Sequence, residues 1–326
     1  MRIAVTGSIA TDHLMAFPGR FVDQLIPDQL DHVSLSFLVD ALEVRRGGVA
    51  ANIAFGLGAL RLDPILAGAV GPDFGEYEVW LKEHGVDTSA VHVSGACQTA
   101  RFMCITDQDN NQIASFYAGA MAEAGRIDLR AVHARSPFDL VLVSPNDPGA
   151  MLRHTEQART LGIPFAADPS QQLARLTGAE VRQLVDGARW LFTNEYESAL
   201  LRERTGWTPA DVLDRVGAWV TTLGEQGVRI ERKGEPTITV PAVPDVPAKD
   251  PTGVGDAFRS GFLAAIGWQL PLRSAAQLGC VMSASVLAAV GSQSYEIQPA
   301  QLLTTLHRVY GSQAAALLEP KLGQLT

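Results

Sequence analysis

The chain has 326 residues, of which 47% are apolar and 19% are charged, and its formal net charge is −9. This composition is ordinary for a globular protein with a sizeable core. The acidic balance argues against a nucleic-acid partner, which would favour a basic face, although local backbone N–H groups can still hold an anionic ligand.

The cysteines and the hydropathy indicate the cellular compartment in which the protein is expected. Cys97, Cys104 and Cys280 lack the CxxC spacing of a metal site, so we interpret them as reduced thiols of a cytoplasmic protein. No segment approaches the ~20 apolar residues that a membrane span needs, and the first residues indicate a buried strand rather than a signal peptide. We therefore expect a soluble protein without a membrane partner.

Short apolar runs alternate with helix-like segments through most of the chain. The runs at 3–5, 65–69, 140–143, 165–167 and 190–193 predict buried strands, and the segments at 50–60, 150–161 and 179–186 predict helices. Such alternation favours an α/β fold with a mainly parallel sheet and helices on both faces. Shorter runs at 221–223, 228–232 and 237–240 indicate an antiparallel edge, and residues 252–290 indicate closely packed helices.

Two segments depart from this rhythm. Residues 12–46 show alternation around 33–37 and 39–44, and residues 97–117 contain two predicted strands, 99–106 and 112–115, joined by a polar turn. Together they predict a small sheet that projects over one edge of the main sheet. A lid over a binding site and an ordinary β excursion explain this pattern equally well.

The segment DPTGVGDAF at residues 250–258 carries the strongest chemical signal. A Gly-x-Gly turn that opens an apolar helix leaves N–H groups unpaired, with the positive end of the helix dipole behind them. Such a turn suits an anion or the charge that develops on a phosphoryl group in transfer. Asp256, beside it, could take the proton from an attacking hydroxyl. A glycine turn with an N-capping aspartate explains the same letters, and one short motif alone favours that simpler interpretation.

A second glycine turn, GGVAAN at residues 47–52, also leads into a helix. Its glycines allow a ligand close to the backbone, and Asn52 offers a donor and an acceptor to a hydroxyl. Asp12 follows the first strand, at the carboxyl edge where ligands of α/β sheets bind. Alone, Asp12 would be interpreted as a turn residue.

Together these segments resemble the PfkB (ribokinase-like) carbohydrate kinases. The resemblance rests on GGVAAN at 47–52, GAVGPDFG at 68–75, NEYE at 194–197, TLGEQG at 222–227 and DPTGVGDAF at 250–258, in the family's order and spacing. It implies one kinase domain over residues 1–326 with a three-layer αβα ribokinase-like fold and a mainly parallel central sheet. A small β lid would be formed by about 12–46 and 97–117.

The resemblance also implies residue roles. Asp256 resembles the catalytic base, and the N–H groups of Gly253, Val254 and Gly255 resemble the anion hole. Asn194, Thr222, Gly224 and Gly227 match ATP contacts, and Glu197 matches the residue that acts on Mg²⁺ through water. Asp12, Gly48 and Asn52 match contacts to the acceptor's sugar hydroxyls. Asp250 and Thr252 match a monovalent-cation site of some members, which leaves K⁺ open for this chain.

A finer resemblance, to actinobacterial adenosine kinases, rests on the strings at 5–15, 33–40, 113–117 and 168–176. It implies that Ser8 and Ser36 lie near a ribose, that Phe102 and Phe116 face a purine, and that Gln171 or Gln172 reaches the base edge. Aromatic rings on opposing lid strands could sandwich a purine, and an amide can pair with adenine. Lid-core packing of the two rings and a solvated glutamine loop are the alternatives.

The implied activity is transfer of the γ-phosphate of ATP, with Mg²⁺, to the 5'-hydroxyl of adenosine, giving AMP in purine salvage. A ribokinase- or fructokinase-type sugar kinase is the alternative, and a catalytically idle nucleoside or sugar sensor is a further one. The chain lacks GxGxxG after its first strand and lacks GxxxxGK[ST], so neither a nicotinamide-dependent dehydrogenase nor a P-loop kinase fits.

The lid also bears on assembly. A sheet of this size cannot bury both of its faces alone, and the apolar residues of 33–39 exceed what one lid face can use. Two lids packed together would cover the excess, and bacterial adenosine kinases of this type pair through their lids. We therefore expect a homodimer through the lid.

Overall fold

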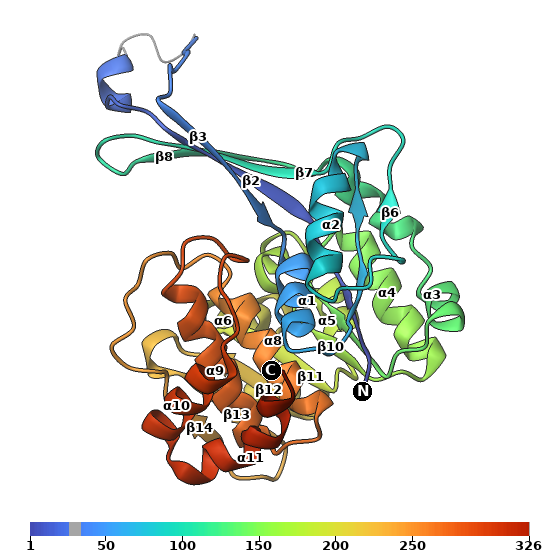
Figure 1. Cartoon of the computed structure of the whole chain (residues 1–326). Coiled ribbons are helices and arrows are strands. Elements are labelled where there is room, and N and C mark those ends of the chain that lie inside the picture. Colours follow the sequence, from blue (N-terminus) through green and yellow to red (C-terminus); the bar gives the residue numbers. More distant parts are fainter. Residues whose placement is uncertain (26–33, 326) are drawn as a thin grey trace.

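The computed structural model describes residues 1–25 and 34–325, and its centre is an eight-stranded sheet in the order β14-β13-β12-β11-β10-β9-β1-β4 (Figure 1). The six strands from β12 to β4 in this order are parallel, and β13 and β14 form an antiparallel edge. The strands are β1 (Ile3–Thr6), β4 (Ile65–Ala67), β9 (Leu140–Val143), β10 (Phe165–Ala167), β11 (Trp190–Asn194), β12 (Trp219–Thr222), β13 (Val228–Glu231) and β14 (Ile238–Val240). The predicted mainly parallel sheet is therefore confirmed.

Helices cover both faces of this sheet, because successive side chains of a strand point to opposite faces and both sets here are apolar. In β1, Ile3 and Val5 belong to one core, and Ala4 belongs to the other. The first core contains side chains of α1 (Val49–Ala59), α2 (Gly75–Glu83), α8 (Val254–Gly267), α9 (Leu272–Leu287), α10 (Pro299–Tyr310) and α11 (Ser312–Leu322). The second contains side chains of α3 (Leu129–Arg135), α4 (Pro148–Leu161), α5 (Gly178–Val185), α6 (Glu195–Thr205) and α7 (Pro209–Leu213). The result is the three-layer αβα arrangement.

Two of the predicted strands differ in detail. The run at 65–69 is broken at Gly68 into β4 and β5 (Ala69–Val70), and β5 pairs with β6 (His92–Val93) instead of continuing in the main sheet. A side chain at Gly68 would lie 2.7 Å from the Gly7 carbonyl oxygen, so the chain turns where only glycine fits. The run at 221–223 belongs to β12, which pairs in parallel with β11 on one side and antiparallel with β13 on the other.

A second sheet of four strands projects from the body (Figure 1). Its order is β3-β2-β7-β8, formed by β2 (Ala10–Ala16), β3 (Ala41–Gly47), β7 (Ala100–Thr106) and β8 (Gln112–Tyr117). We call these four strands the lid sheet. Strand β2 continues the chain directly from the edge of the main sheet, so the lid sheet begins where a ligand would bind.

The alternation predicted around 33–37 is wrong for its described part, because residues 34–39 have no regular secondary structure and Val33 lies outside the described residues. Phe37 instead packs its ring against Phe17 and Phe21, with ring centroids 5.0 and 5.1 Å apart. These three rings form a small cluster at the tip of the lid sheet, whereas Leu35 and Leu38 of the same segment stay exposed.

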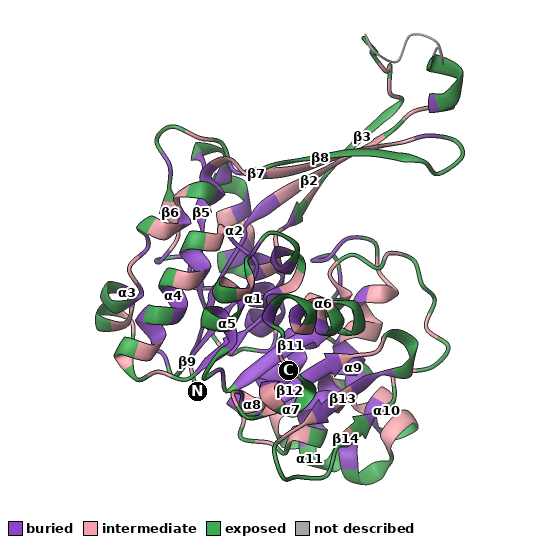
Figure 2. Ribbon diagram, turned by 180° about the vertical axis from the view of Figure 1, so that it is seen from behind, coloured by how far each residue is buried: buried purple, intermediate pink, exposed green. Residues whose placement is uncertain are grey.

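Burial divides the molecule clearly (Figure 2). Most of the main sheet and the helix faces packed against it are buried, whereas every residue of β8 and most residues of β3 are exposed. Within the described part of the chain, no helix combines the length and hydropathy needed to cross a membrane.

One prediction concerns the close crossing of α1 with the end of α2. A Cβ at Gly58, inside α1, would lie 2.2 Å from the carbonyl oxygen of His84. We expect Gly58→Ala to lower the free energy of unfolding by about 1–3 kcal/mol, although alanine favours helix by about 1 kcal/mol. Gly75→Ala is the control, because no atom lies within 4 Å of its added Cβ. Urea denaturation measures both, and equal stability of the Gly58 variant and the wild type would contradict the crossing.

Candidate active site

A cavity of about 550 Å³ lies at the carboxyl ends of β1, β9 and β10, below the lid sheet. This is the edge at which α/β sheets bind ligands. Its lining contains the predicted residues Ser8, Asp12, Gly48, Asn52, Phe102, Phe116, Gln171, Gln172, Thr252, Gly253 and Asp256. It also contains Ala10, Val49, Met121, Pro145 and Arg175, which the sequence had not singled out.

Asp256 lies in the first turn of α8, half-buried at the wall of the cavity. Burial raises the pKa of its carboxyl group, while Asn52 and Arg259 act in the opposite direction. Gly253 begins this helix with φ +78°, and a side chain there would lie 2.5 Å from the Cβ of Ser292. The turn therefore requires glycine, and it places the first N–H groups of α8 beside Asp256.

The three N–H groups predicted as an anion hole are not equivalent. The Val254 N–H donates to the carbonyl oxygen of Pro251 at 3.3 Å, so it is partly engaged. Within the described part of the chain, the N–H groups of Gly253 and Gly255 have no acceptor among the backbone bonds outside regular helices and strands. The helix dipole adds to their positive potential.

Asn52 is held rigidly against Asp256. Its Nδ2 donates to Asp256 Oδ2 at 2.8 Å, and its Oδ1 accepts from Ser292 Oγ and Gln293 Nε2, both at 2.9 Å. Gln293 also contacts the hydroxyl of Tyr77, which donates to the Gly47 carbonyl oxygen at 2.9 Å. Three donors and acceptors thus fix the orientation of the Asn52 amide, which primarily orients the carboxylate of Asp256.

The glycine turn before α1 is equally specific. Gly48 has φ +94°, and a side chain there would lie 2.6 Å from the backbone nitrogen of Ala10. A side chain at Gly47 would lie 2.8 Å from a carboxylate oxygen of Asp12. Ser8 Oγ accepts from the Val49 N–H at 3.0 Å. The first strand, the second strand and α1 therefore meet closely at one corner of the cavity.

Asp12 shares its surroundings with two other charged groups. Burial raises the pKa of Asp12 to about 6, which Asp250 reinforces and Arg45 opposes. Arg45 lies opposite Asp12 on β3, and its Nη1 donates to Asp250 Oδ2 at 3.0 Å. Asp250 also accepts from the N–H groups of Thr252 and Gly291. One guanidinium therefore joins the lid sheet to the turn that precedes α8.

Phe102 and Phe116 lie directly opposite each other on β7 and β8, and Phe102 lies beside Asp12 on β2. Residues paired in this way point to the same face of a sheet. Both rings therefore face the cavity from one side and offer a single platform to a flat ligand. The sandwich between opposing lid strands is not the arrangement that the structure has.

Gln172 is buried in the wall of the cavity. Its Nε2 donates to the Asn146 carbonyl oxygen at 2.8 Å, which fixes the orientation of the amide, and its Oε1 has no partner among the described residues. A buried acceptor without a donor is costly unless a ligand supplies one. Gln171 is exposed, and its Oε1 accepts from Ser170 Oγ.

The residues predicted to contact ATP gather at the ends of β11 and β12, next to the cavity but outside its lining. Asn194 and Thr222 are paired across these strands. Asn194 and Glu197 form the capping box of α6 with two bonds of 2.8 Å, and Glu197 also accepts from Ser170 Oγ. Gly224 and Gly227 have φ of +58° and +96°. The described residues contain no group of three or more His, Cys, Asp or Glu side chains suited to a metal ion.

Ser36 does not join this cluster. It is exposed in the segment before β3 and does not line the cavity.

Sequence reasoning missed a buried ion pair next to the cavity, between Asp168 at the end of β10 and Arg259 in α8. It also missed Ser292, Gln293 and Tyr77, which orient Asn52. Arg259 had a usable signal, because it is a charged residue one turn after Asp256 in an apolar helix. The other three had none, because they come from distant segments.

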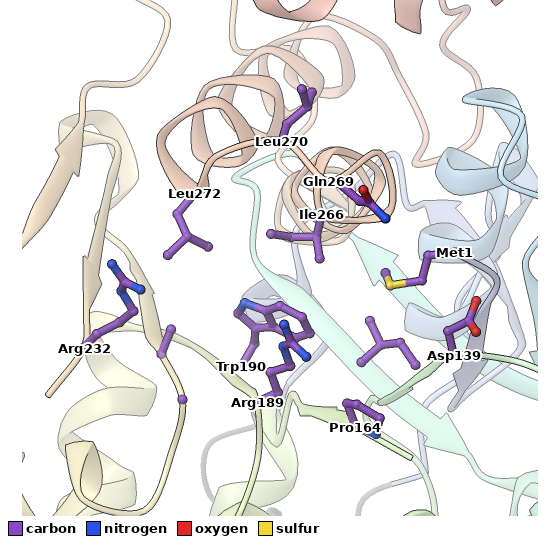
Figure 3. Close-up of a pocket in the computed structure, with 13 residues that line it drawn as sticks. Met1, Asp139, Pro164, Arg189, Trp190, Arg232, Ile266, Gln269, Leu270 and Leu272 are labelled. Carbon is purple, nitrogen blue, oxygen red and sulfur yellow. The ribbon is translucent and has the colours of Figure 1, made fainter. Parts of the chain in front are cut away.

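A second cavity, of about 490 Å³, lies at the opposite edge of the main sheet (Figure 3). Its lining includes Asp139, Pro164 and Trp190, which lie at the amino ends of β9, β10 and β11. None of the predicted site residues lines it. The cavity at the carboxyl ends is therefore the candidate active site.

Comparisons with known proteins identify relatives of this chain. A nucleoside kinase of Methanocaldococcus jannaschii is 29% identical over 250 residues, which cover 76% of this chain and 81% of that protein. The structure of a Burkholderia thailandensis nucleoside kinase in complex with inosine is 33% identical, covers 95% of this chain and 98% of that chain, and has a TM-score of 0.83. A structure of the same kinase in complex with ADP-inosine has a TM-score of 0.80, with 34% identity over 95% of this chain and 96% of that one.

The family model of the pfkB family carbohydrate kinases matches residues 9–298, which include the lid sheet, both glycine turns and Asp256. The resemblance found in the sequence is thereby confirmed. The ribokinase-like fold, the position of the cavity and this match lead to one conclusion: the chain belongs to the pfkB family of carbohydrate kinases.

Proposed function

We propose that this chain transfers the γ-phosphate of ATP to the 5'-hydroxyl of adenosine and thereby produces AMP, an activity that would serve purine salvage. The observation that carries the proposal is the placement of Asp256 beside the N–H groups that open α8, in a cavity that also holds Asp12 and an aromatic platform. Nucleoside kinases among the relatives support a nucleoside as the acceptor. We propose that residues 1–326 act as one catalytic domain, with the lid sheet as its cover.

The proposed step is an in-line transfer. Asp256 takes the proton of the 5'-hydroxyl while the hydroxyl oxygen forms a bond to the γ-phosphorus. The bond from that phosphorus to the β–γ bridging oxygen breaks, and ADP is released. The N–H groups of Gly253 and Gly255, with a smaller share from Val254, stabilise the charge on the transferred group. Asn52 keeps the carboxylate oriented through its 2.8 Å bond.

The acceptor would lie between the lid sheet and the corner of the cavity where the first strand, the second strand and α1 meet. Asp12, Ser8 and the turn at Gly48 line the part of the cavity nearest β1 and suit ribose hydroxyls. The base would stack on Phe102 and Phe116, and the unpaired Oε1 of Gln172 would accept from the amino group of adenine. Because a simple sugar uses neither the platform nor this acceptor, these features favour a nucleoside over the sugar-kinase alternative.

The nucleotide would bind along Asn194, Thr222, Gly224 and Gly227, and the kinase relative in complex with ADP-inosine supports ATP as the donor. Magnesium supplies positive charge to the phosphates when it is bound, and the half-buried carboxylate of Glu197 suits a contact through water. The turn of Asp250 and Thr252 is the proposed place for K⁺. Since Arg45, which also pairs with Glu43, already offers a positive charge to Asp250, we expect K⁺ to have a small effect.

The function is tested by measuring ADP formation with ATP and a panel of adenosine, inosine, cytidine, ribose and fructose. We expect the highest kcat/KM with adenosine. A preference for ribose or fructose would replace the proposal by the sugar-kinase alternative, and ligand binding without turnover would indicate a sensor.

We predict that Asp256→Asn lowers kcat by roughly 10²- to 10⁴-fold, the usual contribution of a general base. Adenosine binding, measured by calorimetry, should stay close to that of the wild type, because the asparagine keeps the shape of the side chain. Turnover like that of the wild type would remove Asp256 from the mechanism.

The platform is tested by Phe102→Ala. We expect the KM for adenosine to rise by about 5- to 150-fold, equivalent to about 1–3 kcal/mol of base stacking, while the KM for ATP barely changes. Phe17→Ala is the matched control, because Phe17 is a half-buried ring of the lid sheet's tip that does not line the cavity. Equal effects of the two variants would show that Phe102 only supports the lid.

We also propose a homodimer that forms through the lid sheet. The row of Arg45, Asp12, Phe102 and Phe116 faces the cavity, so the neighbouring rows face outwards. One outward row crosses all four strands and is entirely apolar: Leu42, Met15, Ile105 and Ile113. Leu42 and Ile113 are 60% and 48% exposed, and Leu38 nearby is 85% exposed. A second lid sheet packed on this face would cover it.

Assembly is tested with a matched pair of valines. Val44 lies on the outward face of the lid sheet and is 55% exposed, and Val79 lies on α2 and is 56% exposed. We predict that Val44→Glu gives a monomer in sedimentation at micromolar concentration, whereas Val79→Glu stays a dimer. A monomeric wild type, or a dimer unaffected by Val44→Glu, would contradict the lid interface without bearing on the kinase activity.

A further inference from the structure

We propose that Arg259 is a positioning residue, which couples the segment that contacts the base to the anion hole and holds Asp256 ready to accept a proton. The inference deepens the proposed function and rests on it. It starts from a buried ion pair that neither the fold nor the substrate contacts explain.

The pair lies directly behind the reacting groups. Arg259 Nη2 donates to Asp168 Oδ1 at 2.6 Å, and Arg259 Nε lies 2.5 Å from Asp168 Oδ2. The third nitrogen, Nη1, donates to the Gly255 carbonyl oxygen at 3.0 Å. The two side chains are 7% and 1% exposed, and the guanidinium also lies over the ring of Phe192 at 5.5 Å. Two of the three guanidinium nitrogens therefore donate hydrogen bonds, and Nε makes only the ion-pair contact.

Stability alone gives no reason for this arrangement. Removing two charges from water costs about as much as their attraction returns, so a buried ion pair contributes little to stability compared with apolar side chains of similar volume. Arg259 is followed in α8 by a buried apolar stretch that includes Phe262, Leu263 and Ala264. We therefore infer that the guanidinium of Arg259 serves the active site rather than the stability of the fold.

The ion pair connects the protein segments that would contact the two ends of the proposed substrate. Asp168 follows β10, and its N–H is anchored to the Val143 carbonyl oxygen. It directly precedes the turn of Ser170–Ala174, which carries Gln172 into the cavity. On the other side, Arg259 holds Gly255, one of the N–H donors of the anion hole. A base that displaces the Gln172 turn would therefore move Gly255 and Asp256 through the two hydrogen bonds of Arg259.

The charge of Arg259 also favours the reactive, deprotonated form of Asp256. The ionisable groups that act on Asp256 are Arg259 from α8, Asp12 from β2 and Asp168 from the end of β10, with the hydroxyls of Tyr77 and Tyr295 also near it. Arg259 is the cation among them, and it opposes the effect of burial and of Asp12 on the pKa of Asp256. Without its charge the pKa of Asp256 would be higher. Because Asp256 must be deprotonated to act as a base, loss of the Arg259 charge should move the acidic limb of the activity profile to higher pH.

The experiment compares a charge-free pair with a charge-conserving change. In the double variant Asp168→Leu/Arg259→Met, both charges are replaced together by apolar groups, so no unpaired charge stays buried. We expect its thermal stability to match or exceed that of the wild type and its kcat to fall about 10²-fold. The acidic limb of its kcat–pH profile should move to higher pH, because Arg259 acts more strongly on the pKa of Asp256 than Asp168 does. In Arg259→Lys the charge stays but the two-pronged contact and the bond to Gly255 are lost, so kcat should fall while the acidic limb stays in place.

A merely structural Arg259 would give another pattern. In that case the double variant would keep both the kcat and the pH profile of the wild type, and this result overturns the proposal. If the double variant does not fold, Arg259→Lys decides alone, because wild-type kcat in it would also overturn the proposal. The assays use adenosine or, if adenosine is not phosphorylated, the best acceptor of the panel. Failure with adenosine contradicts the proposed function only, and a wild-type chain without any kinase activity contradicts both.

Discussion

The hydrogen bond between Asn52 and Asp256 joins the two halves of this site, and most of the surrounding structure serves to keep it in place. Asn52 comes from the helix that follows the lid strand β3, and Asp256 comes from a helix more than 200 residues later. Each helix begins at a glycine with positive φ, Gly48 or Gly253. Because neither turn tolerates a side chain, the first turns of the two helices can approach each other closely. The first N–H groups of α1 donate to Ser8, whereas those of α8 lie beside Asp256.

This constraint also explains why an acidic protein can bind anionic ligands. The net charge of −9 is spread over the chain, whereas the cavity edge collects oriented N–H groups and two arginines, Arg45 and Arg259, each paired with an aspartate. Fixed dipoles in a partly dry site act more strongly than distant surface charges do in water. The potential at a phosphoryl group bound beside Asp256 would therefore depend on a few nearby groups.

The sequence allowed the main sheet and most of the cavity lining to be predicted, because strands buried on both faces and glycine turns leave local patterns. It gave no access to contacts between distant segments. Gln293 and Tyr77 orient Asn52, but neither belongs to a recognisable motif. The face shared by Phe102 and Phe116 depended on strand register, which pairs β7 with β8 directly. Ser36 was placed by resemblance alone, and the segment that carries it has no regular structure.

The lid sheet and the ion pair of Arg259 suggest how closure and chemistry are linked. Arg45 ties the lid strand β3 to Asp250, and Arg259 ties Asp168, which lies just before the Gln172 turn, to Gly255. Both connections end on the short segment before Asp256, one from the lid sheet and one from the end of β10. A simple sugar would contact only the residues near the lid sheet and would act through the Arg45 connection alone. A nucleoside would also contact the Gln172 turn and would act through both connections. Since displacements of about 1 Å at such a site can change the rate by about 10²-fold, this dual attachment would let the enzyme favour nucleosides in kcat as well as in binding.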